Sequence, residues 1–271
     1  MSIPLISVVT PSWNQGEYLA DCLQSCLEGE EGEIEHIVVD NESDDSTHQV
    51  LREFPHVQTI IEKDRGQSDA LNKGIQAARG KWILWLNADD FVTPNGLQSF
   101  LKLARADTSY DAVYGHMMLV DKKSNVFRRV YQASWSPWMA RFGVFALPST
   151  GTLFRASLLR EFPLSEDFHM VMDSEWCLRT MGKVSSRRLQ EFTVAFRVTE
   201  TNKTGGNIMS GEITPRHLTE RKVLAEKYPY YGREGETDRS KAFYLWAAFL
   251  RKAGRYVVLA DKFFSKLRGI K

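Results

Sequence analysis

The feature that most constrains the fold is an apolar run followed directly by acidic residues. Residues 82–86, Trp-Ile-Leu-Trp-Leu, carry no charge, and Asn87-Ala88-Asp89-Asp90 comes next. A short run of this kind is typical of a strand buried in the middle of a parallel sheet. Adjacent carboxylates repel each other unless a cation or a solvated turn offsets the repulsion, so the pattern suggests a divalent-metal site at the strand's carboxyl end. The alternative is a helix-capping turn, because Thr93-Pro94 follows as an N-cap and first helical residue.

Apolar strands and amphipathic helices alternate along the first part of the chain. Strands are expected at 5–10, 34–40, 57–62 and 82–86, and helices at 18–27, 46–54 and 68–78. Four strands with three intervening helices predict a parallel, doubly wound sheet of Rossmann-like type.

Polar turns follow three of these strands, at residues 10–14, 40–45 and 87–90. Ligands of an open parallel sheet bind outside the carboxyl ends of its strands, so we expect the three turns to form one crevice. The sequence contains neither G-x-G-x-x-G after the first strand nor G-x-x-x-x-G-K-[ST], so side chains must form any nucleotide pocket. Trp13 is suited to stacking on a base or to packing as a hydrophobic staple, and Asp40 to accepting hydrogen bonds from a base or ribose. Asp45 is expected to cap the next helix.

Four segments in sequence order resemble glycosyltransferase family 2, the inverting nucleotide-sugar transferases with the GT-A fold. They are SVVTPSWN at 7–14, VVDNESDDST at 38–47, DRGQSDALNKG at 64–74 and LNADD at 86–90. The resemblance covers about residues 4–200 and implies an α/β fold, with a Rossmann-like, mixed and mainly parallel sheet flanked by helices.

The resemblance also implies roles for individual residues. It implies a nucleotide-sugar pocket formed by Thr10, Pro11, Trp13, Asp40, Asp64, Arg65, Asn72, Asn87, Ala88 and Asp89. It places Asp89 on the metal-binding acid of a D-x-D motif, for Mn²⁺ or Mg²⁺, with Asp90 as a second candidate ligand. The first acid of that motif is Asn87 here, which removes one negative charge from the site.

A second set of motifs lies downstream. The segment STGTLFR at 149–155 resembles the acceptor side of the family, and the helix that begins near Met172 carries Asp173 where the family has its catalytic base. A carboxylate in the first turn of a helix is stabilised as the anion, which prepares it to accept a proton. The alternative is an ordinary acid at a helix N-terminus.

Composition limits where the protein acts. With 35 Lys and Arg against 34 Asp and Glu, the formal net charge of +1 gives no field that recruits nucleic acid. The first residues show no signal peptide, no run reaches the length needed to span a bilayer, and three cysteines give no disulfide framework, so we expect a cytoplasmic protein. Cys22 and Cys26 have no partners for a zinc site and are expected to be buried thiols.

The predicted domains are a GT-A domain at 1–210, with a nucleotide-sugar half at 1–115 and an acceptor half at 116–210, and a helical extension at 211–271. The aromatic and basic residues of 127–147 fit either a sugar or lipid-phosphate site or plain core. Lys203 is expected on a loop that closes over the diphosphate. Residues 241–271 contain eight basic residues and one acid, which fits either binding to the anionic inner membrane face or packing on the body.

The function expected from these features is inverting transfer of a sugar from a nucleoside diphosphate sugar, with UDP as the expected nucleotide. The acceptor would be a hydroxyl of a glycan or lipid-linked saccharide in bacterial surface polysaccharide biosynthesis. Two alternatives are a sugar-nucleotide nucleotidyltransferase, which would need a glycine-rich basic loop at residues 10–16, and a catalytically weak carbohydrate-binding relative, which the Asn87 substitution allows.

Overall fold

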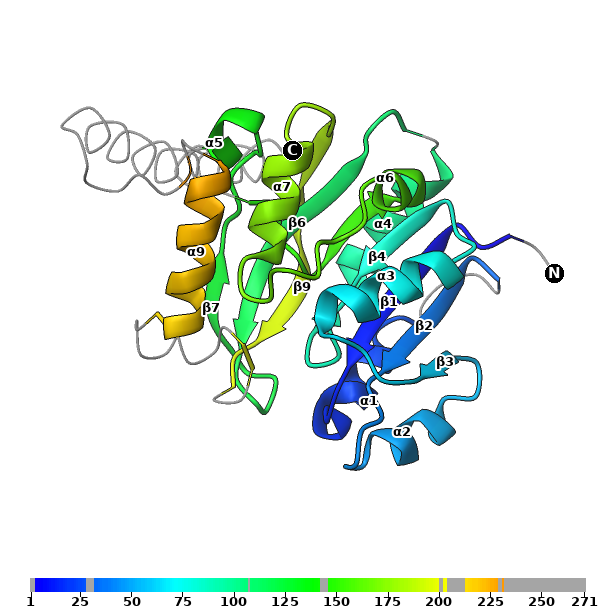
Figure 1. Ribbon diagram of the computed structural model, residues 1–271. Helices are drawn as coiled ribbons and strands as arrows, with labels where there is room; N and C mark the ends of the chain where they lie inside the picture. Colours follow the sequence, from blue (N-terminus) through cyan, green and yellow to red (C-terminus); the bar gives the residue numbers. More distant parts are fainter. Residues whose placement is uncertain are drawn as a thin grey trace.

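The first four strands form the parallel half of a mixed sheet (Figure 1). The computed structural model describes residues 3–27, 32–106, 108–141, 146–199, 202–203, 213–228 and 231. The strands are β1 Ile6–Ser12, β2 Ile34–Asp40, β3 Gln58–Ile61 and β4 Trp82–Trp85, and the helices between them are α1 Gly16–Gln24, α2 Thr47–Glu53 and α3 Gln67–Ala77. The pairs β1–β2, β1–β4 and β2–β3 are parallel, so the predicted order of strands and helices is confirmed.

The second half of the sheet mixes strand directions. Its strands are β5 Phe91–Val92, β6 Ala112–Val120, β7 Val126–Val130, β8 Thr152–Arg155 and β9 Ser186–Arg197. The helices are α4 Pro94–Arg105, α5 Pro137–Arg141, α6 Ala156–Glu161, α7 Met172–Thr180 and α9 Pro215–Lys227. The sheet order is β3-β2-β1-β4-β8-β6-β9-β5, with β7 on β6. Strand β8 runs antiparallel to both β4 and β6, whereas β6 and β9 are parallel, so the sheet is mixed as predicted.

Helices cover both faces of the sheet because side chains alternate along each buried strand. On β1, Val9 packs in a cluster that includes residues of α3, α6 and α7, whereas Val8 packs in a second cluster with residues of α4. Helix α4 begins as predicted, because the Thr93 side chain accepts a hydrogen bond from the backbone N–H of Gly96 and Pro94 occupies the first turn. Both faces of the central strands are therefore core, which explains their lack of polar alternation.

Helix α9 packs on the body of the protein. Leu224 of α9 is fully buried in the same cluster as Trp176 of α7, and Tyr231 belongs to it as well. The described residues of the predicted extension, 213–228 and 231, thus share the core that covers one face of the sheet, and the boundary at residue 210 remains a prediction. The basic tail at 241–271 and residues 142–145 of the aromatic stretch lie outside the described residues.

Two absences apply to the described part of the chain. None of its helices combines the length and apolar character needed to cross a bilayer. All three cysteines are free and buried, and burial raises the pKa of the Cys26 thiol to about 12. Inert core thiols are what the sequence predicts for this pair.

Candidate active site

The turns that follow β1 and β2 are held together by side-chain hydrogen bonds. Asn14, with a positive φ of 51°, donates its backbone N–H to the Ser43 hydroxyl at 2.8 Å. The Asp45 carboxylate accepts the backbone N–H of Gly16 and of Thr47, both at 2.9 Å, and so serves the N-termini of both α1 and α2. This confirms Asp45 as a capping residue and gives the two turns one fixed arrangement.

Trp13 and Asp40 lie on these joined turns. The Trp13 side chain is 63% exposed, so it is available for stacking and is not packed as a hydrophobic staple. Asp40 is fully buried, and its carboxylate accepts hydrogen bonds from the Ser43 backbone N–H at 2.9 Å and hydroxyl at 2.6 Å. The His48 Nε2 atom lies 2.9 Å from the same carboxylate. These contacts fix the orientation of Asp40. Two of them fall on Oδ2 and one on Oδ1, so only Oδ1 has lone-pair capacity for one further donor.

Thr10 and Pro11 precede that tryptophan. Thr10 is fully buried, and its hydroxyl lies 2.8 Å from the Nε2 atom of His36. Burial lowers the pKa of His36 to about 3, so the imidazole is neutral at physiological pH. Thr10 therefore supports the strand end from inside, whereas Pro11 is only partly buried.

The segment between β3 and α3 places the remaining predicted nucleotide residues in different surroundings. Asp64 accepts the Gly66 N–H at 2.8 Å, and burial raises the pKa of its carboxyl. Arg65 is exposed and forms a 2.7 Å ion pair with Glu166. Asn72 points elsewhere: its carboxamide exchanges two 2.9 Å hydrogen bonds with the backbone of Leu164. Both polar atoms of Asn72 thus hold two chain segments together, which favours a structural role.

The acidic turn after β4 directs its first and last polar residues inward. The Asn87 side-chain oxygen accepts hydrogen bonds from Gln67 at 2.8 Å and Trp85 at 2.9 Å, and its nitrogen donates to Asp90 at 3.1 Å. Asp90 is fully buried and also accepts the backbone N–H of Arg197 at 2.9 Å. Burial, together with repulsion from the neighbouring carboxylate, raises the pKa of Asp90 well above its usual range. The structure therefore does not present Asp90 to a metal as the sequence predicts, because its oxygens are occupied inside the protein.

Asp89 is the acid of this turn that reaches the surface, whereas Ala88 beside it is buried. The Asp89 carboxylate accepts a hydrogen bond from the Asn202 side chain, and burial raises the pKa of Asp89. The Asn202 nitrogen also donates to the Arg197 carbonyl at 2.5 Å, whereas the Asn202 side-chain oxygen is buried and has no hydrogen-bond partner among the described residues. Within residues that the structure describes, no group of three or more His, Cys, Asp and Glu is arranged to hold a metal. A cation at Asp89 would need other oxygen ligands.

A buried arginine organises this turn. Arg197, at the end of β9, is 1% exposed, and its Nε donates to the Asp89 carbonyl at 2.9 Å. One terminal nitrogen pairs with Asp21 at 2.7 Å, and the other donates to the Lys122 carbonyl at 3.1 Å. The guanidinium lies 4.7 Å from the centre of the Tyr18 ring. Sequence analysis missed Arg197, although a lone arginine in the apolar run FTVAFRV is a signal for a buried, multiply bonded cation.

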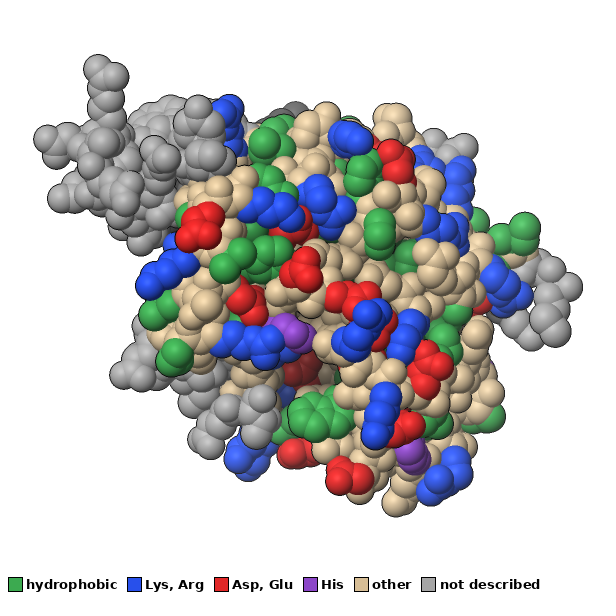
Figure 2. Space-filling view, in the orientation of Figure 1, with side chains coloured by type: hydrophobic (Ala, Val, Ile, Leu, Met, Phe, Trp, Pro, Cys, Tyr) green, Lys and Arg blue, Asp and Glu red, His purple; other side chains and the backbone are tan. Residues whose placement is uncertain are grey.

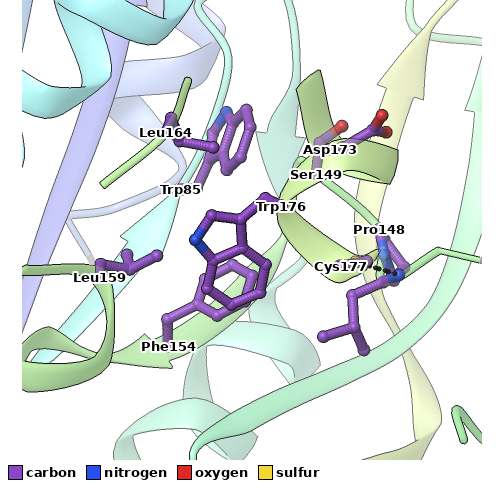
Figure 3. A pocket seen from close by; sticks show the side chains of 10 residues that line it. Trp85, Pro148, Ser149, Phe154, Leu159, Leu164, Asp173, Trp176 and Cys177 are labelled. Carbon is purple, nitrogen blue, oxygen red and sulfur yellow. Dashed lines mark hydrogen bonds between the residues drawn. The ribbon is translucent and has the colours of Figure 1, made fainter. Parts of the chain in front are cut away.

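Asp173 lies in the first turn of α7, as predicted. Its carboxylate accepts the Ser174 backbone N–H at 2.7 Å. It lines a small, mostly apolar pocket that Trp85 and Trp176 also line, and Figure 3 shows Asp173 beside Ser149 at one side of that pocket. Burial raises the pKa of Asp173, and this outweighs the stabilisation of the anion that the helix N-terminus provides. The prediction that the surroundings of Asp173 stabilise its anion is thus wrong, because the net shift of its pKa is upward.

One acidic and one basic side chain from later in the sequence contact the segment that precedes Asp173. The carboxylate of Glu220, in α9, accepts the backbone N–H groups of residues 169, 170 and 171 at 3.0, 2.6 and 3.3 Å. Lys203 donates to the Gln67 side chain at 2.8 Å and to the His169 carbonyl at 3.4 Å. Lys203 also interacts electrostatically with Asp64 and Asp173.

Lys203 thereby links the predicted donor and acceptor sides. Figure 2 shows acidic side chains recessed near the middle of this face, with a histidine and basic side chains around them. The structure brings together the polar turns after β1, β2 and β4 and the N-terminal turn of α7, whereas Asn72 lies apart. Gln67, Asn202 and Glu220 were not predicted, because each has a partner that is distant in sequence: Asn87 for Gln67, Asp89 for Asn202, and the backbone of residues 169–171 for Glu220.

The mixed sheet, the acidic turn after β4 and the carboxylate at the start of α7 are the features that the sequence resemblance implies. Residues 7–165, more than half of the chain, match the family described as glycosyl transferase family 2, and the chain belongs to that family. The predicted resemblance and the GT-A fold are confirmed.

Three comparisons place the chain among known proteins. It is 30% identical over 133 residues to the chondroitin synthase of Escherichia coli, which covers 48% of this chain and 19% of the synthase. The structure of S. aureus TarS residues 1–349 with UDP-GlcNAc superposes with a TM-score of 0.64 at 18% identity, covering 81% of this chain and 65% of that one. The mannosyltransferase PcManGT of Pyrobaculum calidifontis, in complex with GDP-Man and Mn²⁺, gives 0.58 at 17% identity over 96% of this chain and 76% of the other. The structural matches support the fold.

Proposed function

We propose that this glycosyltransferase transfers a sugar from a UDP-sugar to a hydroxyl of a saccharide or lipid-linked saccharide, with inversion at the anomeric carbon, in bacterial surface polysaccharide biosynthesis. The observation that carries the proposal is the position of Lys203. Its ammonium donates hydrogen bonds to Gln67, in the first turn of α3, and to the carbonyl of His169, four residues before Asp173, so one basic side chain connects the donor segment with the start of α7. The similarity to chondroitin synthase and the UDP-GlcNAc in the TarS structure support this class of reaction.

The nucleotide would occupy the joined turns after β1 and β2. The exposed Trp13 ring offers a stacking surface for the base, and the fixed Asp40 carboxylate has one acceptor position left, on Oδ1, for a base N–H. Lys203 lies where it can pair with a phosphate oxygen once Gln67 releases it. The pocket thus supplies stacking and hydrogen-bond acceptance for the base and positive charge for the diphosphate.

The site fits a divalent cation through oxygen ligands. Asp89 is the partly exposed carboxylate of the turn and would hold Mg²⁺ or Mn²⁺, with diphosphate oxygens and water as further ligands. When bound, the ion supplies positive charge to the leaving diphosphate. Asn87 and Asp90 hydrogen-bond each other inside the turn, so Asp89 is the acid of the turn that would face the donor.

Asp173 is proposed as the general base. It takes the proton from the acceptor hydroxyl as that oxygen forms a bond to the anomeric carbon, while the bond from that carbon to the diphosphate oxygen breaks and the electron pair leaves with the nucleotide. Attack from the face opposite the diphosphate inverts the anomeric configuration. The raised pKa of Asp173 gives it a greater proton affinity than an exposed aspartate has, which suits this role.

The basic tail supports a second part of the proposal. Residues 241–271 carry a net charge of +7 and many interleaved apolar side chains, a composition that fits attachment to an anionic inner membrane face. Binding of the full chain to vesicles containing anionic lipid should weaken as salt rises, because salt screens the attraction. Equal binding to neutral and anionic vesicles would contradict this part.

The test of the proposed function combines binding and catalysis. In a thermal-shift panel of UDP-, GDP- and dTDP-sugars with and without Mn²⁺, UDP-sugars with Mn²⁺ should raise the melting temperature most. Asp89→Ala should abolish the metal-dependent part of that shift and leave the melting temperature of the free protein nearly unchanged. A stronger response to GDP-sugars would overturn the donor assignment, and unchanged Mn²⁺ dependence in Asp89→Ala would overturn the metal assignment.

A further inference from the structure

We propose that Asn202 is a second protein ligand of the divalent cation, through its side-chain oxygen, and that it replaces the acid missing at position 87. This inference rests on the proposed metal-dependent transfer. Asn87 cannot supply the missing ligand, because its side-chain oxygen already accepts hydrogen bonds from Gln67 and Trp85. Asp90 is fully buried and bonded to Asn87 and Arg197.

The Asn202 carboxamide has a fixed orientation. Its nitrogen donates to the Arg197 carbonyl and to the Asp89 carboxylate, and neither acceptor could bond the oxygen instead. Its backbone N–H donates to the Thr199 hydroxyl at 3.1 Å, which holds the segment in place. The Asn202 nitrogen that bonds the Asp89 carboxylate and the Asn202 oxygen belong to one planar carboxamide. The oxygen therefore lies near the Asp89 carboxylate.

That oxygen is buried without a hydrogen-bond partner among the described residues. An unpaired buried acceptor destabilises the folded state, and a bound ligand removes that cost. Carboxamide and carboxylate oxygens together form the donor set that Mg²⁺, Mn²⁺ and Ca²⁺ prefer. Asp89 and Asn202 thus give one charged and one neutral ligand to the same ion.

The position of Asn202 also couples the metal to the diphosphate. Lys203 follows it directly and donates a hydrogen bond to the side chain of Gln67, in the first turn of α3. A metal ion held by Asn202 would also restrain the neighbouring residue Lys203, whose ammonium we assign to a phosphate oxygen. Metal binding would therefore order Asn202, Lys203 and, through the Lys203 hydrogen bond, Gln67.

The test measures Mn²⁺ affinity of the full chain by the electron paramagnetic resonance signal of free Mn²⁺, with UDP present. Asn202→Ala should weaken Mn²⁺ binding by at least about tenfold. Asn202→Asp keeps an oxygen ligand and adds a charge, so it should bind Mn²⁺ at least as tightly as the native protein. In the absence of metal, Asn202→Asp should melt at a lower temperature because Asp89 repels it, and Mn²⁺ should raise its melting temperature more than that of the native protein.

Asn95→Asp is the matched control, because Asn95 is an exposed asparagine in the first turn of α4 and should leave Mn²⁺ affinity unchanged. Native Mn²⁺ affinity in Asn202→Ala would overturn the inference. So would equal losses in Asn202→Ala and Asn202→Asp, which would show that Asn202 acts through the Arg197 carbonyl alone. If Asn202→Ala does not fold, the increase in melting temperature that Mn²⁺ gives Asn202→Asp is the test. An increase no larger than that of the native protein would overturn the inference. Failure of the native protein to bind Mn²⁺ would instead refute the proposed metal dependence itself.

Discussion

Glu220→Gln tests whether α9 belongs to the catalytic domain. The Glu220 carboxylate, 11% exposed, accepts three backbone N–H groups from residues 169–171, which lead into the first turn of α7. Hydrogen bonds to a charged acceptor contribute about 1.5–3 kcal/mol and neutral ones about 0.5–1.5 kcal/mol, so loss of the charge costs about 1 kcal/mol for each bond. The ion pair with Arg216, which is 59% exposed, adds little. The variant should lose about 2–3 kcal/mol of unfolding free energy.

The pH dependence of this loss follows from the direction of the pKa shift. Burial alone would raise the pKa of Glu220, but the N–H donors of residues 169–171 and the Arg216 side chain together hold it below its ordinary value. A carboxyl whose folded-state pKa is lowered stabilises the protein above its unfolded value of about 4.3, and this contribution disappears as pH falls through the folded value. The difference between native protein and variant should therefore be greatest at pH 7 and shrink in acid.

The assays are urea unfolding at pH 7 and at acidic pH, with donor and acceptor kinetics at pH 7. Because the bonded segment positions Asp173, kcat should fall more than the donor KM rises. Glu226→Gln is the matched control, since Glu226 is an exposed glutamate on the same helix. Equal stability of the two variants, or a pH-independent loss in Glu220→Gln, would refute the argument.

Three further predictions address the base, the nucleotide pocket and the core. Asp173→Asn should lower kcat at least about a hundredfold and raise the melting temperature at pH 7 but not below about pH 4, because the raised folded-state pKa makes the charged form costly only at higher pH. An unchanged melting temperature at pH 7 would contradict the burial argument. Trp13→Ala should weaken UDP binding by about 1–3 kcal/mol in calorimetry without lowering stability, since the ring is exposed; full UDP affinity would exclude stacking. Leu224→Ala should cost about 2–5 kcal/mol in urea unfolding, against about 0.5 kcal/mol or less for the half-exposed control Val223→Ala, and similar losses would argue against a buried α9.

The parallel half of the fold was predictable because its signals are local. Apolar runs, amphipathic periods and polar turns between residues 5 and 86 each lie within one element, and Asp45, Thr93 and Pro94 act within a few residues of the helices they start. The order of the second half was not predictable in this way. Strand β8 enters between β4 and β6, and the two-residue β5 pairs with β9, so these pairings depend on contacts between distant segments.

The candidate site shows the same division. Motifs locate Asp89 and Asp173, but the sequence cannot tell which of two adjacent acids turns inward, and Asp90 does so because the backbone of Arg197 bonds it. Asn72 lies in a motif segment, yet its partner is the backbone of Leu164, 92 residues away. The orientation of Asn202 depends on carbonyl and carboxylate acceptors that no local pattern reveals.

The bond between Asp90 and Arg197 also sets the order in which a growing chain can acquire its acidic turn. The two residues are 107 positions apart, and synthesis proceeds at about 5–20 residues per second, so the ribosome needs about 5–20 s between them. During that interval β1 to β4 are complete, but Asp90 lacks its backbone donor and the Asp89 carbonyl lacks the guanidinium. A nascent chain that ends before residue 197 would therefore contain the parallel half of the sheet without a finished acidic turn. The candidate site is complete only after nearly the whole sheet has been synthesised.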